Sequence, residues 1–391
     1  MNYSKEEVVQ YTQEEDVKFI RLAFCDVFGN PKNISIMPDE LPRAFAYGVA
    51  FDPSAITGFG TAQGELVLHP EPETLMPLPW RPEHGSVVQM FCSVTDRSGA
   101  PFVCDTRAIL KKAVGQAARA GVQFSFGSVQ KFYLLLLDEN GKPTSVPCDD
   151  AGYMDIAPED KGENVRREIC LTLEQMGIRP ARSHHEEGPG QNGIEIRCAD
   201  ALTAADQAMT FRRAAKTVAF RNGMAAVFSP KPFDGRPGND FFIRMTPSGD
   251  AQALRAMIAG VKARCPEMTA FFNPTEESYK RIADAKSDLF SEKCPALVRV
   301  CGAENAAPYA LFRSPDPTAN PYLAFALLIA AGLEGMQKGL ILYAPEETAP
   351  LFSFAGLPER AKEAKVLAAQ SAFIRAHIPP EILAILCGAQ Q

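Results

Sequence analysis

The stretch from residue 183 to residue 197 constrains the fold of this chain more than any other part of the sequence. It places two histidines and two glutamates, at 184–187, directly before a Gly-Pro-Gly turn, after which Ile194 and Ile196 alternate with polar residues. Alternation with a period of two is typical of a half-buried strand, and Gly-Pro sequences commonly turn the chain. We therefore predict a β-hairpin with an acidic turn, which suits either a hard divalent cation or a solvated acidic loop.

Length and composition narrow the class of protein. The 391 residues, 46% hydrophobic and 22% charged, are typical of a folded chain of two domains. A formal net charge of -7 gives no reason to expect nucleic acid or an anionic membrane as partner. The ten cysteines contain no CxxC pair, so we expect free thiols in a cytoplasmic protein. The longest apolar run, residues 322–333, is too short to span a bilayer.

The sequence divides into two segments that differ in their expected secondary structure. Residues 17–104 contain short strand-like runs separated by proline-rich turns, with helices expected only at 5–15 and 39–47. From Thr106 onward longer helices alternate with strands, and a capping box at Thr203 opens one of them. The other helices of this segment are expected at 106–120, 163–176, 251–271 and 321–339, and its strands at 122–126, 131–137, 225–229 and 241–246. We therefore place a domain boundary between residues 105 and 106.

Several short motifs, ordinary when taken singly, resemble the glutamine synthetase family of short bacterial type in their order and spacing. They are Phe51-Asp52-Pro53-Ser54, Ser183-His184-His185-Glu186, Lys231-Pro232-Phe233, Asn273-Pro274-Thr275 and Pro315-Asp316-Pro317. The resemblance implies an α+β protein in which residues 1–105 form a β-grasp domain and residues 106–391 a glutamine synthetase-type catalytic α/β domain. It also implies a role in nitrogen metabolism and a homo-oligomer of stacked rings, in which neighbouring subunits share each active site.

The family reaction sets the chemistry that such a site needs. Family members phosphorylate the γ-carboxylate of glutamate with ATP, and ammonia then displaces the phosphate. Divalent cations screen the phosphate charge while arginines stabilise the charge that develops in the transition state. The resemblance implies six metal ligands, five glutamates and one histidine.

At those ligand positions the chain departs from the family pattern. Only Glu186 is retained as a metal ligand. The altered positions of the site are Val129, Lys131, Gly193, Phe242, Arg244 and Leu311. Lys131 places a positive charge where a carboxylate would bind metal, and apolar residues such as Phe242 offer no ligand atom. Because Mg²⁺ gives up its water reluctantly, it would gain little from such a pocket.

The substrate side of the family site is better matched. Asp52 and Ser54 match residues that reach into a neighbour's active site, where Asp52 would bind and deprotonate ammonium. The positions that match residues holding glutamate and phosphate are Arg281, Arg299, Arg313 and Gly238, and Arg299 is also a catalytic candidate. The flap between Arg281 and Arg299 is shorter than usual and lacks the family's catalytic glutamate.

Two readings of these departures remain open. The first is a pseudoenzyme that has lost the two-metal glutamate–ammonia ligase site, needs no cofactor, and binds a small anion or amino acid or regulates an active glutamine synthetase paralogue. The alternative is an active glutamine synthetase or γ-glutamyl-amine ligase with a rebuilt metal site, using ATP with Mg²⁺ or Mn²⁺. Replacement ligands would come from Glu187, Asp240 or Glu304, whereas Lys131 and Arg244 could form an anion site. Neither reading includes nucleic acid or a membrane as partner.

Overall fold

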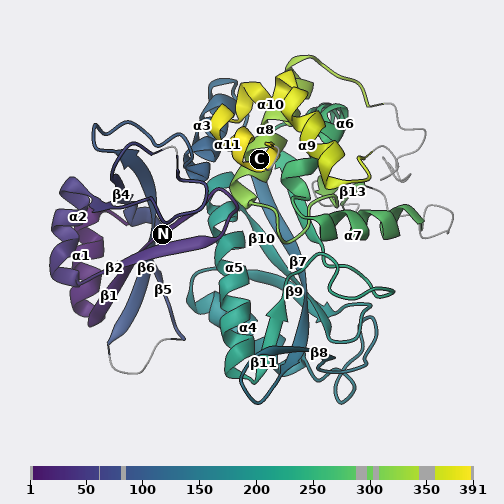
Figure 1. Cartoon of the computed structure of the whole chain (residues 1–391), viewed down its shortest axis with the longest axis horizontal. Coiled ribbons are helices and arrows are strands. Elements are labelled where there is room, and N and C mark those ends of the chain that lie inside the picture. Colours follow the sequence, from purple (N-terminus) through teal and green to yellow (C-terminus); the bar gives the residue numbers. More distant parts are fainter. Residues whose placement is uncertain are drawn as a thin grey trace.

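The computed structural model describes residues 3–60, 62–80, 85–287, 297–302, 308–342 and 357–388. A smaller N-terminal domain, purple and blue in Figure 1, lies beside a larger domain in teal and green, and the yellow C-terminal helices pack on the larger one. Among the described residues no helix is long and apolar enough to cross a membrane.

The N-terminal domain is built on a six-stranded sheet in the order β2-β1-β6-β4-β3, with β5 paired to β6. Its strands are β1 (Val17–Cys25), β2 (Pro31–Ile36), β3 (Val49–Phe51), β4 (Leu66–Pro70), β5 (Met76–Pro77) and β6 (Ser86–Asp96), and its α-helices are α1 (Lys5–Glu14) and α2 (Leu41–Tyr47). The central strands β1 and β6 run parallel. Both are apolar along most of their length because they form the core of the domain. The predicted α+β character is confirmed.

The larger domain contains an eight-stranded sheet in the order β13-β14-β12-β7-β10-β9, with β8 and β11 paired to the C-terminal half of β7. The strands are β7 (Phe124–Leu137), β8 (Pro143–Pro147), β9 (Pro180–His185), β10 (Gln191–Asp200), β11 (Met224–Val227), β12 (Phe241–Pro247), β13 (Val298–Cys301) and β14 (Tyr309–Phe312). Two separate strands predicted at 122–126 and 131–137 are one continuous β7, so that prediction was wrong. Gly127 lies within this strand at a point where β10 passes closely: a Cβ there would be 3.1 Å from the Ile196 carbonyl oxygen.

Helices complete the domain, and several of them pack against one face of the sheet. They are α3 (Thr106–Arg119), α4 (Glu163–Gln175), α5 (Ala201–Arg221), α6 (Ala251–Phe272), α7 (Glu276–Ser287), α8 (Pro321–Gln337), α9 (Ala361–Gln370), α10 (Ala372–His377) and α11 (Pro380–Cys387). The predicted start of α5 at Thr203 was wrong, because the Asp200 side chain caps the helix by accepting the N–H groups of Leu202 and Thr203. α8 is apolar on nearly every side and is correspondingly buried.

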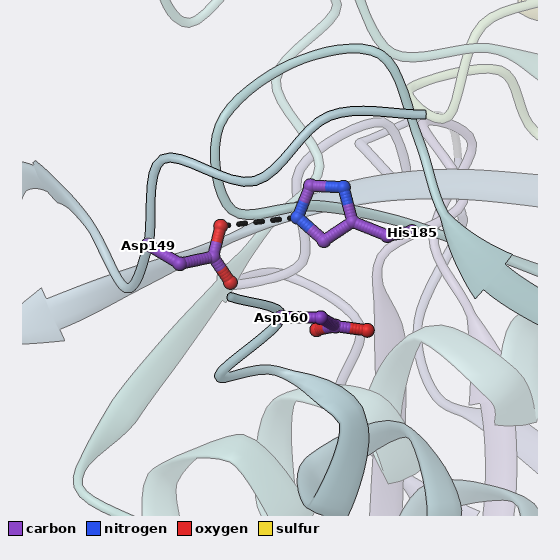
Figure 2. A group of neighbouring side chains, drawn as sticks. All are labelled: Asp149, Asp160 and His185. Carbon is purple, nitrogen blue, oxygen red and sulfur yellow. Dashed lines mark hydrogen bonds and ion pairs between the residues drawn. The ribbon is translucent and has the colours of Figure 1, made fainter. Parts of the chain in front are cut away.

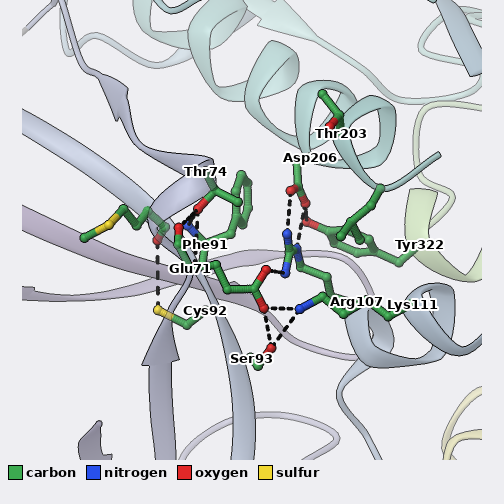
Figure 3. Close-up of polar contacts among 12 residues, drawn as sticks. Glu71, Thr74, Phe91, Cys92, Ser93, Arg107, Lys111, Thr203, Asp206 and Tyr322 are labelled. Carbon is green, nitrogen blue, oxygen red and sulfur yellow. Dashed lines mark hydrogen bonds and ion pairs between the residues drawn. The ribbon is translucent and has the colours of Figure 1, made fainter. Parts of the chain in front are cut away.

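A buried ion-pair network joins the two domains at Arg107 on α3 (Figure 3). The Arg107 guanidinium donates to Asp206 of α5 at 2.9 and 2.8 Å and to Glu71 of the N-terminal domain at 2.5 Å. Tyr322 of α8 donates its hydroxyl to the same Asp206 at 2.7 Å, and Lys111 pairs with Glu71. The Arg107 side chain is only 4% exposed, so the ion pairs are shielded from water and salt.

Candidate active site

The candidate site is centred on Lys131, in the middle of β7. The strand pairing puts Gly193 of β10 opposite Lys131 and Phe242 of β12 opposite Val129. The Lys131 ammonium lies 3.0 Å from a Glu186 oxygen and 3.4 Å from an Asp240 oxygen. Burial disfavours a charge there, but Asp240 and Glu186 outweigh it and raise the pKa of Lys131. Lys131 is therefore an internal cation held by two carboxylates.

Glu186 fits into space that exists only because residue 193 is glycine. Its other carboxylate oxygen lies 3.2 Å from the His184 Nε2. A Cβ at Gly193 would lie 2.4 Å from that same oxygen, which no real contact allows. Burial opposes ionisation of Glu186, yet His184 and Lys131 overcome it and lower the pKa of the carboxyl. Gly193 thus makes room for Glu186, and Glu186 in turn neutralises Lys131.

The residues at the family's metal positions do not fit a divalent cation. Both Glu186 oxygens already have partners, and the Phe242 ring lies 5.1 Å from the Lys131 ammonium. A cation would have to displace Lys131 and would find apolar neighbours at Val129 and Leu311. The same geometry shows that the predicted anion site at Lys131 was wrong, since this ammonium faces two carboxylates.

Three nearby acids had been considered as replacement ligands. Glu187 is exposed and lies outside the cluster. Asp240 is shared between Lys131 and Arg281. Glu304 lies outside the described residues. Glu195 pairs with Arg182 at 2.5 Å, because Arg182 is its direct neighbour across the β9–β10 ladder.

Arg281 of α7 is fixed in the site by several contacts. It donates to an Asp240 oxygen at 2.5 Å, to the Asn273 side chain at 2.9 Å and to the Ser314 carbonyl. A Cβ at Gly238 would lie 2.7 Å from the Arg281 Cγ, so the glycine allows the arginine to pass. Arg281 and Gly238, two of the predicted substrate-side residues, are therefore in direct contact.

Arg313 differs from Arg281 because it has no carboxylate partner among the described residues. Its guanidinium lies 4.9 Å from the centre of the Phe242 ring, on which Lys131 also rests. Burial, together with the positive charges of Arg299 and Arg281, lowers the pKa of Arg313, although Asp240 opposes the shift. Arg299 is exposed on β13, opposite Leu311 of β14. Arg313 is therefore a cation available to an anion.

The remaining predicted residues lie apart from this cluster. Arg244 stacks on Tyr309 with 3.7 Å between its guanidinium carbon and the ring centre, and no described residue hydrogen-bonds to its buried Nε. Asp52 is exposed in the N-terminal domain and accepts the Ser54 backbone N–H at 2.8 Å. Within the described chain no contact joins Asp52 or Ser54 to the Lys131 cluster, so their role in a neighbouring site stays a prediction.

A second cluster, which the sequence had not indicated, lies beneath the hairpin turn (Figure 2). It contains Asp149, Asp160 and His185, whose possible ligand atoms all lie within 4.8 Å of one another. His185 Nε2 lies 3.0 Å from an Asp149 oxygen, and Nδ1 donates to the Glu186 carbonyl at 2.8 Å. Asp149 also accepts the Gly190 N–H at 2.7 Å. The cluster therefore holds the turn that carries Glu186.

The same three side chains meet the distance requirement for a metal ion. A carbonyl fixes the Nδ1 proton of His185, which leaves Nε2 directed at Asp149, an arrangement common around metal-binding histidines. Burial alone would lower the pKa of His185, but the hydrogen bond to Asp149 outweighs burial and raises it. The raised pKa favours a proton on Nε2, between the imidazole and Asp149. Arg166 binds both Asp160 oxygens at 3.0 and 2.6 Å. A metal ion would thus compete with a proton and with a guanidinium.

Comparison with known proteins identifies the family that this chain resembles. The family model described as "Glutamine synthetase, catalytic domain" matches residues 103–384, and "Glutamine synthetase, beta-Grasp domain" matches residues 16–97. A glutamine synthetase of Clostridium saccharobutylicum is 37% identical over 358 residues, covering 86% of this chain and 81% of the relative. One of Methanocaldococcus jannaschii is 36% identical over 376 residues, covering 89% and 83%.

A solved structure shares the fold. The structure described as "GmaS/ADP complex-Conformation 1" has a TM-score of 0.83 at 24% identity and covers 99% of this chain and 94% of that chain. Our expectation that no cofactor is used was wrong. The curated relatives are glutamine synthetases, the fold accommodates ADP in GmaS, and Asp149, Asp160 and His185 form a group that could hold a metal ion. On the two domain matches and these relatives, the chain belongs to the glutamine synthetase family.

Proposed function

We propose that this protein is an ATP-dependent ligase that joins ammonia or an amine to the γ-carboxylate of glutamate or of a similar acid. The observation that carries the proposal is Arg313, a cation with no carboxylate partner among the described residues, beside Arg281 and Arg299. A partly buried guanidinium of this kind binds carboxylate or phosphate with strong, charge-assisted hydrogen bonds. The likeness to glutamine synthetases over most of the chain supports the reaction class.

In this proposal the chain's own side chains position the substrate and stabilise charge. Arg313 and Arg299 would bind the acid or the phosphoryl group, and Arg281 would hold Asp240 and thereby Lys131 in place. ATP phosphorylates the carboxylate, and the amine then displaces phosphate to form the amide. Phosphoryl transfer depends mainly on positioning and electrostatic stabilisation, which suits a site rich in cations. Because the family's metal positions do not fit a divalent cation, no metal at those positions takes part in this proposal.

The Lys131 cluster favours a second candidate, a binding protein that keeps the substrate pocket without turnover. In that case Lys131, fixed by Glu186 and Asp240, maintains the shape of the pocket and does no chemistry. The two candidates differ in one observable: the ligase releases ADP, whereas the binding protein takes up glutamate or nucleotide and releases none.

The experiment is a coupled assay of ADP release from the purified full-length chain with ATP and glutamate. Ammonium, methylamine and ethylamine are tested in turn, each with Mg²⁺ and with Mn²⁺, and mass spectrometry identifies the γ-glutamyl product. We expect ADP and amide in equal amounts. Arg313→Gln should lower kcat/KM at least about tenfold, because one charge-assisted contact is lost. The matched control, Arg43→Gln, changes an exposed arginine of α2.

Absence of ADP from every combination would refute the ligase. Calorimetric titration with glutamate and with ATP would then decide whether the binding candidate stands.

Oligomeric rings, with Asp52 reaching a neighbouring site, remain part of the proposal and are tested by sedimentation velocity. A monomer that is active on its own would contradict that part. A cytoplasmic location is in keeping with the nine described cysteines, all free thiols.

A further inference from the structure

A second pocket lies at the junction of the two domains, on the opposite face of the sheet from Lys131. It has a volume of about 610 Å³, which is within the range of small-molecule sites. The N-terminal domain contributes the loop Phe28–Asn30, and the larger domain contributes α5, β11 and the β7–β8 hairpin. Arg212 lies over the Phe241 ring and Lys131 over the ring of its neighbour on β12, Phe242. Because successive side chains of a strand point to opposite faces, the sheet lies between the two sites.

Two cations lie in this pocket, and none of the lining residues that the structure describes is an aspartate or glutamate. Arg212 and Lys216 are four residues apart on α5 and therefore share one face of the helix. Arg212 uses one nitrogen to donate to the Ala319 carbonyl at 3.0 Å, while its buried Nε has no partner among the described residues. Asp316, whose charge reaches Arg212, is fully buried and accepts from Thr318.

Lys216 is the less constrained of the two cations. Its ammonium lies 5.8 Å from the centre of the Phe228 ring and has no carboxylate partner within the described ranges. Burial and the charge of Arg212 lower the pKa of Lys216. Burial also lowers the pKa of Arg212, to about 10, so it stays charged at neutral pH. Two neighbouring positive charges repel each other, and a bound anion would remove this repulsion.

The rest of the pocket wall is apolar and aromatic. Its apolar side chains include Phe28, Leu137, Phe220, Met224, Val227 and Phe228. Phe220 is 62% exposed, and Phe28 is 38% exposed. Large exposed aromatic side chains around a concave site commonly mark a place where a ligand binds. A ligand that suits this wall and the two cations has an anionic group and an apolar body.

We propose that this pocket binds a small organic anion, with its carboxylate or phosphate on Arg212 and Lys216 and its apolar part among the phenylalanines. The ligand would contact residues of both domains, because Phe28 and Asn30 line the same pocket as α5. Binding here would not require the ligase site.

The test uses the full-length chain without nucleotide, titrated calorimetrically with benzoate, phenyl phosphate and benzyl alcohol. We expect saturable binding of at least one anion and none of the neutral alcohol; the tighter anion identifies the preferred group. Lys216→Gln should weaken anion binding about tenfold or more, because a charge-assisted contact is lost. Lys362→Gln, at an exposed lysine of α9, is the matched control.

Phe220→Glu provides an independent variant, since its exposed position leaves the core intact. A carboxylate at the pocket entrance should repel the anion and abolish binding. The proposal is overturned if the unmodified chain binds neither anion, if benzyl alcohol binds as well as benzoate, or if Lys216→Gln binds as tightly as Lys362→Gln. ADP release is measured on the same variants and should be unchanged, so the result does not depend on the proposed ligase activity.

Discussion

Gly193→Ala tests whether Lys131, Glu186 and Gly193 form one fitted unit. The new Cβ would lie 2.4 Å from a Glu186 oxygen, and real Cβ contacts are essentially never below 3.0 Å. The oxygen must therefore move by at least 0.6 Å, the difference between these two distances. The Glu186 Cγ and Cδ, both at 3.2 Å, allow little room for it to move. The shift strains the contacts of Glu186 with His184, at 3.2 Å, and with Lys131, at 3.0 Å.

Because both contacts involve a buried charge, we expect Gly193→Ala to lower the free energy of unfolding by about 1.5–3 kcal/mol. The measurement is urea denaturation of the variant and the parent at one protein concentration. The control is Gly115→Ala in α3, where the nearest atom to a new Cβ, the Arg119 Nη1, is 3.6 Å away. That change should stabilise the helix by about 0.5–1 kcal/mol.

A double-mutant cycle makes the test specific. In a Glu186→Ala background the steric conflict is gone, so Gly193→Ala should cost less than about 0.5 kcal/mol. If Gly193→Ala is as stable as the parent, or costs the same with and without the Glu186 side chain, the reasoning about the fitted unit is refuted.

Two further predictions concern charge. Arg107→Met leaves Asp206 and Glu71 buried without their shared guanidinium, and we expect a loss of about 3–5 kcal/mol in urea denaturation; a loss below about 1 kcal/mol would contradict it. Arg264 lowers the pKa of Glu334 from 4.5 to about 2, so this ion pair stabilises the fold above pH 4.5 and its contribution is lost as pH falls toward 2. Glu334→Gln should lose about 1 kcal/mol at pH 6, because solvent screens this partly exposed ion pair, and little at pH 2.5; an equal effect at both pH values would be the contrary result.

Much of the fold could be predicted because local patterns and long-range structure agree. The helix expected at 106–120 is α3, Thr106–Arg119, since its apolar spacing, its Asp105 cap and its packing all favour the same ends. The continuity of β7 could not be predicted, because the glycine at 127 is needed for close approach of β10 and for no turn. Strand order was also beyond the sequence, since it is decided by partners far apart in the chain.

The candidate site, too, could be predicted from the sequence only in part. Which positions are altered could be seen from motif spacing, but where the side chains lie could not. Lys131, Glu186 and Asp240 come from different segments, and only the sheet register shows that the lysine is held between the two carboxylates. The Asp149 and His185 pair gave no signal at all, because 36 residues separate the two. The domain boundary at residue 106 remains a prediction.

The network around Arg107 has a consequence for how the protein unfolds. Chains of two domains often melt in two steps, with one domain surviving the loss of the other. Here the departure of the N-terminal domain would take Glu71 away from Arg107 and open the paired Asp206 to water. The larger domain would lose part of its own buried interior in that event. The two domains should therefore unfold together, as a single cooperative unit.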